Sequence, residues 1–338
     1  MSSKEDDREN GSDSQLSRVD DTEISKMYNG IYCIEKNGIK WVMPSAYSEI
    51  SEYISNFKTK PDDTYIVTFP RSGTTWTQEL IWLVANDLNF ELATSKSLTR
   101  RFPYIEQNVV VGRKHISKYI NELTNNVLLK EEDAAKNWTN YIDALPSPRF
   151  LKTHLAILLS KFVENNCKAI YVARNPKDML VSYYHFHKAF KPFNCKMNFT
   201  QFAEYFMADL TFYCPLVEHL KIGWEHRNKP NVLFLFYEDL KKDLLGCVKR
   251  VCKFYGKTYS DVDLERLVEH LEFRNFHNNP MVNLSKPKDD DTSTLAPRSF
   301  IRKGQIGSWK EEFSPDLVTK FDRWLAEKLT GTDIVLPN

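Results

Sequence analysis

The stretch YIVTFPRSGTTWTQEL, residues 65–80, joins a strand-like pattern to a helical pattern across a short polar turn. Residues 65–69 are all β-branched or aromatic, which is typical of a buried strand. From Trp76 onward the apolar residues share one face of a helix: Trp76, Leu80, Leu83 and Val84. A strand that enters a helix through a glycine-bearing turn leaves unpaired backbone N–H groups at the helix start, and such groups attract an anion.

The turn itself carries side chains that suit an anion. Arg71 offers a guanidinium group, and hydroxyl groups surround Gly73 at Ser72, Thr74 and Thr75. The turn is not a Walker A loop, which needs a second glycine and a lysine followed by a hydroxyl residue. Because Ser and Thr also cap ordinary helices, the pattern predicts either a phosphate cradle, which we favour, or a simple helix start.

Four strand-like runs alternate with helical stretches along the chain: residues 65–69, 149–152, 169–173 and 232–236. Short apolar strands separated by helices predict βαβ units, whose ligands bind at the carboxyl ends of parallel strands. The sequence therefore predicts a single α/β domain, residues 31–338, with a central parallel β-sheet flanked by helices and a P-loop-like nucleotide-binding core. The polar, proline-interrupted segment 279–299 is interpreted as a long loop or lid.

Charge is unevenly distributed along the 338 residues. Residues 1–24 contain eight acidic and three basic residues, so that the rest of the chain carries the positive excess. Residues 1–30 lack apolar periodicity and are predicted to form a disordered acidic tail. The basic remainder suits a multiply charged anionic ligand, but its charges are too dispersed to predict a nucleic-acid partner.

Cysteine usage and hydropathy favour the cytoplasm. The six cysteines include no CxxC pair and are interpreted as reduced thiols. No apolar run approaches the roughly 20 residues that span a bilayer, and no signal peptide is recognisable, so no membrane partner is predicted. The pair His185 and His187 lacks a clear third ligand, and no metal site is predicted.

The second strand run ends in RFLKTHL, where two chemically useful side chains point the same way. Lys152 and His154 are two residues apart, and in an extended chain such residues project from the same face. A cation and a general base would then face one site. The alternative for His154 is a histidine that only caps or packs.

The third and fourth strand ends and a later loop add further anion and base contacts. Arg174 ends the third strand, and Ser182 lies in the second turn of a helix that Asn175 caps and Pro176 begins, so Arg174 and Ser182 can share a phosphate. Tyr237 ends the fourth strand and could stack on a base. In the loop SFIRKGQIGSWK, Arg302, Lys303 and Gly304 could hold a second phosphate; the alternative is an ordinary pair of cations on a surface loop.

Together these segments suit a ligand with two anionic ends and a base between them, beside a histidine that accepts a proton. From about residue 40 onward the chain resembles the cytosolic sulfotransferases, as an insect-like member with arginine in the phosphosulfate loop. FPRSGTTW is similar to their 5′-phosphosulfate loop, RNPKDMLVSYYHF to their 3′-phosphate segment, and RKGQIGSWK to their C-terminal signature. The resemblance implies transfer of a sulfuryl group from 3′-phosphoadenosine 5′-phosphosulfate (PAPS), with PAP as product and no metal.

The resemblance also implies a role for each matching residue. His154 is the base, and Lys152 and Arg71 carry charge at the transferring group. The donor contacts implied are Arg71, Ser72, Gly73, Thr74, Thr75, Trp76, Arg174, Ser182, Tyr237, Phe273, Phe276, Arg302, Lys303 and Gly304. The acceptor contacts implied are Phe102, Tyr104, Lys152, His154 and Phe186. The acceptor would be a small apolar phenol, steroid or isoprenoid alcohol, or an amine.

The chain departs from the family pattern at three places. Arg71 stands where the family usually has lysine; arginine stabilises charge but is a poor general acid. Leu271 and Glu272 replace a Thr-Ser pair next to the adenine. The resemblance allows a homodimer, but the KxxxTVxxxE motif that many members use is degraded, because Ser314 and Pro315 replace its Thr-Val pair.

Three other functions remain open at this level. A nucleoside or nucleotide kinase would use the same strand, turn and helix for ATP, although the Walker lysine is missing. A non-catalytic PAP-binding protein would need neither Lys152 nor His154. An allylic alcohol acceptor would change the outcome, because sulfate can leave again and the net reaction becomes a dehydration.

Overall fold

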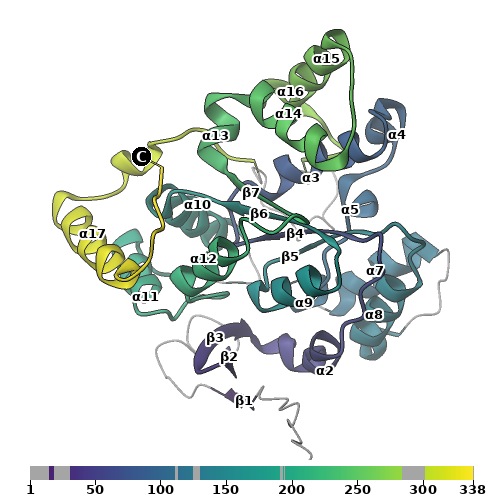
Figure 1. The fold of residues 1–338 in the computed structure, drawn as a ribbon. Coiled ribbons are helices and arrows are strands. Elements are labelled where there is room, and N and C mark those ends of the chain that lie inside the picture. Colours follow the sequence, from purple (N-terminus) through teal and green to yellow (C-terminus); the bar gives the residue numbers. More distant parts are fainter. Residues whose placement is uncertain are drawn as a thin grey trace, which may run out of the picture.

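A four-stranded parallel sheet lies at the centre of the molecule (Figure 1). The computed structural model describes residues 15–18, 31–110, 113–124, 130–190, 193, 195–283 and 301–337. In spatial order the strands are β5 (Phe150–Thr153), β4 (Thr64–Thr68), β6 (Lys168–Ala173) and β7 (Val232–Phe236). All three pairings are parallel, which confirms the predicted α/β fold. Each observed strand begins and ends within one residue of its predicted run.

The side chains of alternate β4 residues pack into two separate apolar cores. Tyr65 and Val67 pack into the core shared with the helices on one face, whereas Ile66 packs into the core on the other face. Because both faces of the strand are covered, β4 is completely buried and reads as a continuous apolar run. Figure 1 shows helices on both sides of the sheet, with α15 and α16 above it and α9 below it.

The helices that cover these faces have these bounds. The segments that precede β5 are η1 (Ser45–Glu49), α2 (Ser51–Ser55), α3 (Thr74–Ala85), α4 (Phe90–Ser95), α5 (Leu98–Arg101), α6 (Gln107–Val110), α7 (Arg113–Thr124), η2 (Glu131–Asp133) and α8 (Ala134–Ala144). Those between β5 and β7 are η3 (Ala156–Leu158), α9 (Leu159–Glu164), α10 (Pro176–Ala189), α11 (Phe199–Met207) and α12 (Leu216–Glu225). Those after β7 are α13 (Tyr237–Lys242), α14 (Leu244–Tyr255), α15 (Asp261–Leu271), α16 (Phe273–Asn278), η5 (Ser308–Glu311) and α17 (Pro315–Leu329).

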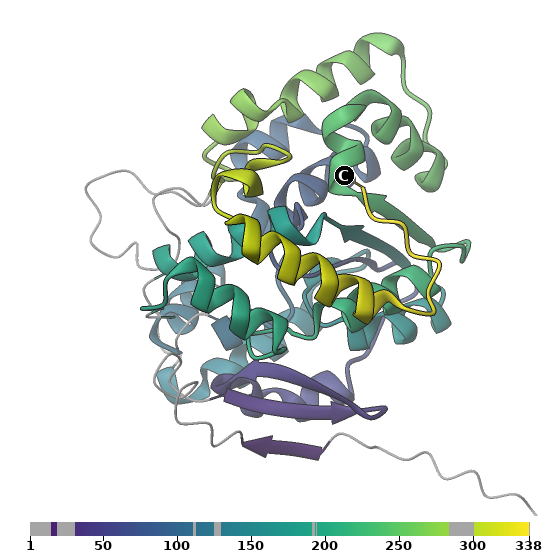
Figure 2. The ribbon, with the colours of Figure 1, turned by 90° about the vertical axis from the view of Figure 1, so that its left-hand side faces the viewer.

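A second, antiparallel sheet was not predicted from the sequence. It consists of β1 (Gln15–Arg18), β2 (Ile31–Lys36) and β3 (Ile39–Pro44) (Figure 2). The turn between β2 and β3 is Asn37-Gly38, with positive φ at both residues, as a two-residue hairpin favours. Strand β1 lies within the predicted acidic tail, and the rest of residues 1–30 lies outside the described residues.

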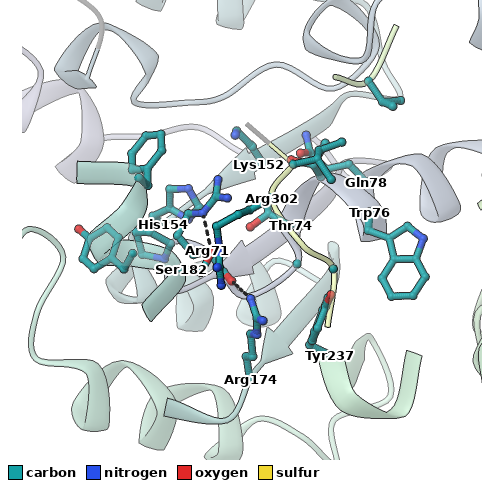
Figure 3. Close-up of a pocket in the computed structure, with 18 of the residues that line it drawn as sticks. Arg71, Thr74, Trp76, Gln78, Lys152, His154, Arg174, Ser182, Tyr237 and Arg302 are labelled. Atoms are coloured by element: carbon teal, nitrogen blue, oxygen red, sulfur yellow. Dashed lines mark hydrogen bonds between the residues drawn. The ribbon is translucent and has the colours of Figure 1, made fainter. Parts of the chain in front are cut away.

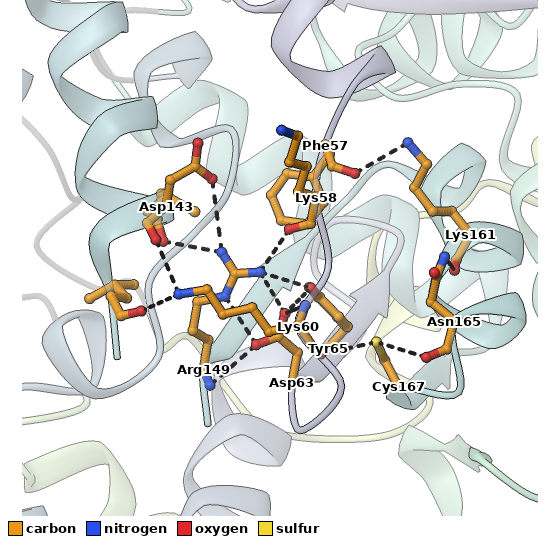
Figure 4. A network of polar contacts seen from close by, with 12 residues as sticks. Phe57, Lys58, Lys60, Asp63, Tyr65, Asp143, Arg149, Lys161, Asn165 and Cys167 are labelled. Carbon is orange, nitrogen blue, oxygen red and sulfur yellow. Dashed lines mark hydrogen bonds and ion pairs between the residues drawn. The ribbon is translucent and has the colours of Figure 1, made fainter. Parts of the chain in front are cut away.

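Buried polar groups connect the amino-terminal ends of β4 and β5 (Figure 4). Arg149 donates from Nε to Asp63 Oδ1 at 3.0 Å and from Nη2 to Asp63 Oδ2 at 2.6 Å, with both side chains almost fully buried. The Tyr65 hydroxyl also donates to Asp63. Because a bidentate pair has a fixed geometry, these contacts fix the start of β5 against the start of β4.

Three further predictions concern the loop 279–299, the cysteines and membrane-spanning helices. Of the predicted loop 279–299, residues 284–299 lie outside the described residues. All six cysteines are free thiols. Among the described helices, none has the length and apolar character needed to cross a membrane.

Candidate active site

The loop between β4 and α3 opens a cradle of backbone N–H groups at the start of a twelve-residue helix. Gly73 is the N-cap residue of α3, with φ of +95°, so no side chain occupies the position that usually caps the first amides. A Cβ atom at Gly73 would lie 2.6 Å from the Tyr237 ring, which excludes any larger residue. The helix start therefore remains available to an anion.

Three arginines surround this helix start (Figure 3). Arg71 donates from Nε to Ser182 Oγ at 3.2 Å, and Arg174 donates from Nη1 to the Arg71 carbonyl at 3.0 Å. Burial lowers the pKa of Arg71 to about 10, and the charges of Arg174 and Arg302 contribute to that lowering. Like charges this close repel one another, and an anion with several negative oxygens would relieve that repulsion.

A second part of the pocket is lined by rings that suit a planar base. The rings of Trp76 and Tyr237 lie 5.8 Å apart at an angle of 63°, and the Arg174 guanidinium lies 4.3 Å from the centre of the Tyr237 ring. Lys241 lies 5.5 Å from the centre of the Trp76 ring. Lys241 was not predicted as a site residue. It lies on α13, four residues after Tyr237, and no recognisable motif surrounds it.

Phe273 and Gly304 meet at the boundary between the base region and the arginines. Gly304 has φ of +60°, and a Cβ atom there would collide with the Phe273 ring. Phe276 is buried in the core behind it and also lines the pocket. Lys303 is partly exposed and forms an ion pair with Glu311.

His154 leaves β5 with its ring orientation fixed by the neighbouring strand. Its Nδ1 lies 2.7 Å from the Thr68 carbonyl oxygen. Because a carbonyl can only accept, Nδ1 carries the proton, and the neutral ring presents Nε2 as a proton acceptor. Burial lowers the pKa of His154 well below its ordinary value, and the charge of Lys152 lowers it further, so the ring is neutral at physiological pH.

Lys152 lies beside His154 on the same pocket wall (Figure 3). Its Nζ is 4.5 Å from the centre of the Tyr104 ring, which offers a cation a favourable but weak contact. Burial lowers the pKa of Lys152 to about 8; Arg71 contributes to that lowering, whereas Glu106 opposes it. The ammonium group is thus protonated at neutral pH and close to its titration range.

The peptide group of His154 is held on both sides by buried residues that the sequence analysis did not identify. Glu106 Oε1 accepts the His154 N–H at 2.6 Å. His219 Nε2 lies 3.2 Å from the His154 carbonyl, which it reaches from α12. Burial lowers the pKa of His219 to about 4, so the neutral ring donates from Nε2 while Nδ1 accepts from the Tyr171 hydroxyl.

The remaining wall of the pocket is aromatic. Phe186 stacks on Phe190 with ring centres 5.4 Å apart, and the Arg71 guanidinium lies 5.2 Å from the centre of the Phe186 ring. The Tyr104 and Tyr213 hydroxyls are hydrogen-bonded to each other at 2.6 Å. Other apolar residues that line the pocket include Leu98, Phe102, Val110, Phe193 and Val282.

Eighteen of the nineteen predicted site residues line this one pocket. The exception is Ser72, which is buried and does not line it. His187 packs among aromatic rings and lies within hydrogen-bonding distance of the Tyr183 carbonyl, and His185 pairs with Glu312. No cluster of His, Cys, Asp and Glu suited to a metal occurs among the described residues.

A family model described as "Sulfotransferase domain" matches residues 61–333, a range that includes the whole parallel sheet. The chain belongs to the sulfotransferase family. It is 33% identical over 296 residues to the luciferin sulfotransferase of Photinus pyralis, covering 86% of this chain and 77% of that protein. It is 34% identical over 286 residues to Sulfotransferase 1C2 of Homo sapiens, covering 83% and 88%. A solved structure of retinol dehydratase in complex with retinol and PAP matches with a TM-score of 0.81 at 30% identity, covering 96% of this chain and 98% of that one.

Family membership confirms the predicted enzyme class. The protein is a PAPS-dependent sulfotransferase, which transfers a sulfuryl group to a hydroxyl acceptor and takes PAPS as its co-substrate. Its pocket brings a helix start and three arginines next to a group of rings. These are the groups that the two anionic ends and the adenine of such a donor require.

Two departures of this sulfotransferase from the family pattern have a local structural explanation. The Leu271 side chain is fully buried, and its carbonyl accepts the Trp76 indole N–H at 2.8 Å, so the backbone holds the ring. Ser314 and Pro315 form the start of α17: Ser314 is the N-cap and Pro315 the first helical residue. These two residues therefore serve to start α17.

Proposed function

We propose that this sulfotransferase moves the sulfuryl group directly from PAPS to the hydroxyl of a small apolar acceptor, with His154 as the general base. The tautomer of His154 supports this proposal most strongly. The Nδ1–H donates to the Thr68 carbonyl, so Nε2 is the nitrogen that can accept a proton inside the pocket. A histidine that only packed would not need its unprotonated nitrogen in the cavity.

In the proposed reaction one bond forms as another breaks. The acceptor oxygen bonds to sulfur, its proton passes to His154 Nε2, and the bond from sulfur to the phosphate oxygen breaks to release PAP. Lys152 and Arg71 stabilise the negative charge that develops on the sulfuryl and bridging oxygens. Arg71 acts only electrostatically, because even a pKa of about 10 leaves it fully protonated at neutral pH.

The donor would lie along the line from the helix start to the arginines. Its 5′ end would contact Arg71, Thr74 and Thr75, and its 3′-phosphate would contact Arg174, Ser182 and Arg302. The adenine would lie between Trp76, Tyr237 and Phe273. Each of these residues lines the pocket, and together they supply a cation or hydroxyl for each anionic group.

The acceptor is proposed to be a flat, apolar alcohol or phenol. One part of the pocket lining is formed by Phe186, Phe190 and Phe193, whose rings lie 4.8 to 5.7 Å apart. Such a surface favours rings or polyene chains over polar metabolites. Related solved structures contain retinol and androsterone, which are alcohols of this kind.

For allylic alcohols we also propose a net dehydration, because the chain is similar to retinol dehydratase. After sulfuryl transfer, the allylic carbon–oxygen bond of the ester would break and release sulfate. Loss of a proton from the conjugated carbon chain would then give an alkene. The first step and its residues would be unchanged.

Two experiments test the proposal. A panel of phenols, steroids and isoprenoid alcohols is incubated with PAPS, and the products are identified by mass: addition of a sulfuryl group, or loss of water. In parallel, PAP should raise the melting temperature much more than ATP with Mg²⁺, because a ligand stabilises the folded state that it binds. No product from any hydroxyl acceptor, or a larger shift with ATP, would overturn the proposal.

A further inference from the structure

Glu106 is a buried carboxylate that touches the base of the proposed reaction without lining the pocket. The segment before it runs beside the end of β5, because Lys152 N donates to the Pro103 carbonyl at 2.9 Å and Ile105 N donates to the Lys152 carbonyl at 2.9 Å. This pairing places Glu106 next to the backbone of His154. Its side chain is fully buried, and Oε1 accepts the His154 N–H at 2.6 Å.

A buried carboxylate is costly, so its presence calls for a reason. Removing an ionised group from water costs several kcal/mol unless hydrogen bonds and an opposite charge compensate. Burial raises the pKa of Glu106 to about 7, while the His154 N–H and the Lys152 charge favour its ionised form. An apolar residue of similar size would avoid this cost. Proteins keep such destabilising buried charges mainly at functional sites.

We propose that Glu106 is a positioning residue for sulfuryl transfer: it holds the backbone N–H of His154 in place and puts a negative charge beside the strand end that carries Lys152. The inference rests on the proposed function and deepens it. These two effects can be tested separately. Holding the His154 N–H requires a hydrogen-bond acceptor at Oε1, whereas the effect on Lys152 requires a negative charge. Glu106 would touch neither donor nor acceptor, so it acts only through Lys152 and His154.

Among the groups around Glu106, Lys152 is the one whose pKa falls in the range where the charge of Glu106 would matter. They come from β5, from the segment before Glu106, from the segment before α12 and from η1: Lys152, Thr153, His154, Tyr104, Tyr213 and Tyr47. Burial raises the pKa of each tyrosine above its ordinary value, and burial lowers that of His154. Arg71 and His219 act on Lys152 or His154 from the pocket side and from α12. Between pH 7 and 9, Lys152 is thus the cation whose protonation depends on Glu106.

The decisive variant is Glu106→Gln, which keeps the side-chain shape and an oxygen acceptor but removes the charge. Lys152 then loses the opposite charge that Glu106 supplies, and a contact of that kind moves a pKa by roughly 1 to 3 units. We expect the alkaline decline of kcat/KM, measured with an aliphatic alcohol acceptor and PAPS, to move to lower pH by about one unit. At pH 7, PAP should still raise the melting temperature as it does in the parent.

A matched control is Glu238→Gln. Glu238 is also fully buried, and its Oε1 accepts a backbone N–H, that of Asn175, at 2.9 Å. It follows β7, and its charge acts on Arg174 and Asp178. The same substitution there should leave the alkaline decline where it is in the parent.

The positioning effect is tested by Glu106→Asp, which keeps the charge but shortens the side chain. Here the alkaline decline should stay in place while kcat falls by about tenfold or more, because small misplacements of a catalytic group are costly. An unmoved decline in a folded Glu106→Gln, or parent-like kcat in Glu106→Asp, would overturn the inference. If Glu106→Gln does not fold, the Glu106→Asp result decides alone. These failures are distinct from failure of the proposed function, in which the parent itself would sulfonate no hydroxyl acceptor.

Discussion

The protonation state of Lys152 should set the upper pH limit of the enzyme. Its side chain is partly buried and lines the pocket beside the position proposed for the transferring group, and desolvation lowers its pKa to about 8. Only the protonated form can stabilise the negative charge of the sulfuryl group. Turnover at low substrate should therefore decline as the pH rises through about 8.

The size of the decline follows from this value. With a pKa of about 8, about nine-tenths of the molecules carry a protonated Lys152 at pH 7 and about one-tenth at pH 9, so kcat/KM should fall roughly tenfold between them. The assay uses an aliphatic alcohol, whose hydroxyl does not ionise in this range, at constant ionic strength. Product is quantified by mass.

Lys152→Arg provides the control, because arginine remains protonated throughout this pH range. The variant should have lower activity at pH 7, since its larger head group fits differently, but its profile should be flat from pH 7 to 9. A flat profile in the parent would refute the reasoning. A tenfold decline that persists in Lys152→Arg would equally refute it, because another group would then be titrating.

Three further predictions test other parts of the site. His154→Ala should lower kcat by about 10²- to 10⁴-fold and leave PAP affinity nearly unchanged, which turnover and thermal-shift titrations check together; near-normal turnover would return His154 to a packing role. Arg71→Lys should keep much of the activity, whereas Arg71→Ala should lose it, because only the lysine variant retains a cation at this position; equal activities would contradict this. Gly304→Ala should weaken PAP binding in the same thermal-shift titration, because its φ of +60° and the adjacent Phe273 ring both oppose a side chain; unchanged PAP affinity would contradict it.

The parallel sheet was predictable because its strands are buried on both faces. Each therefore appears in the sequence as a short apolar run, as at Val232–Phe236, and turn or capping residues mark the start of the next helix. Asn175 and Pro176 cap and begin α10 as predicted, since these residue types have strong positional preferences at helix starts. The sheet of β1–β3 was missed because its hairpin lies near an acidic, polar segment whose average composition favours disorder.

The site was predictable where motifs lie at strand ends, because parallel strands bring their carboxyl ends to one edge. Thr68 and Lys152 lie at the carboxyl ends of β4 and β5, and Arg174 directly follows β6, so all three lie at this edge. Glu106 and His219 could not be found in this way. Glu106 reaches His154 through a one-residue bridge between Tyr104 and Lys152, and His219 reaches it from a helix, so neither follows a recognisable strand.

The pocket concentrates positive charge from Arg71, Lys152 and Arg174. The charge of Arg71 lowers the pKa of both Lys152 and His154, and Glu106 is the carboxylate that opposes it at Lys152. Bound PAPS would add negative charge next to Lys152 and so favour its protonated form. Because kcat/KM reports the free enzyme and kcat the bound complex, the alkaline decline of kcat should lie at higher pH than that of kcat/KM. Coincident declines would mean that the donor's sulfuryl group does not approach Lys152, and the cation would then need another role.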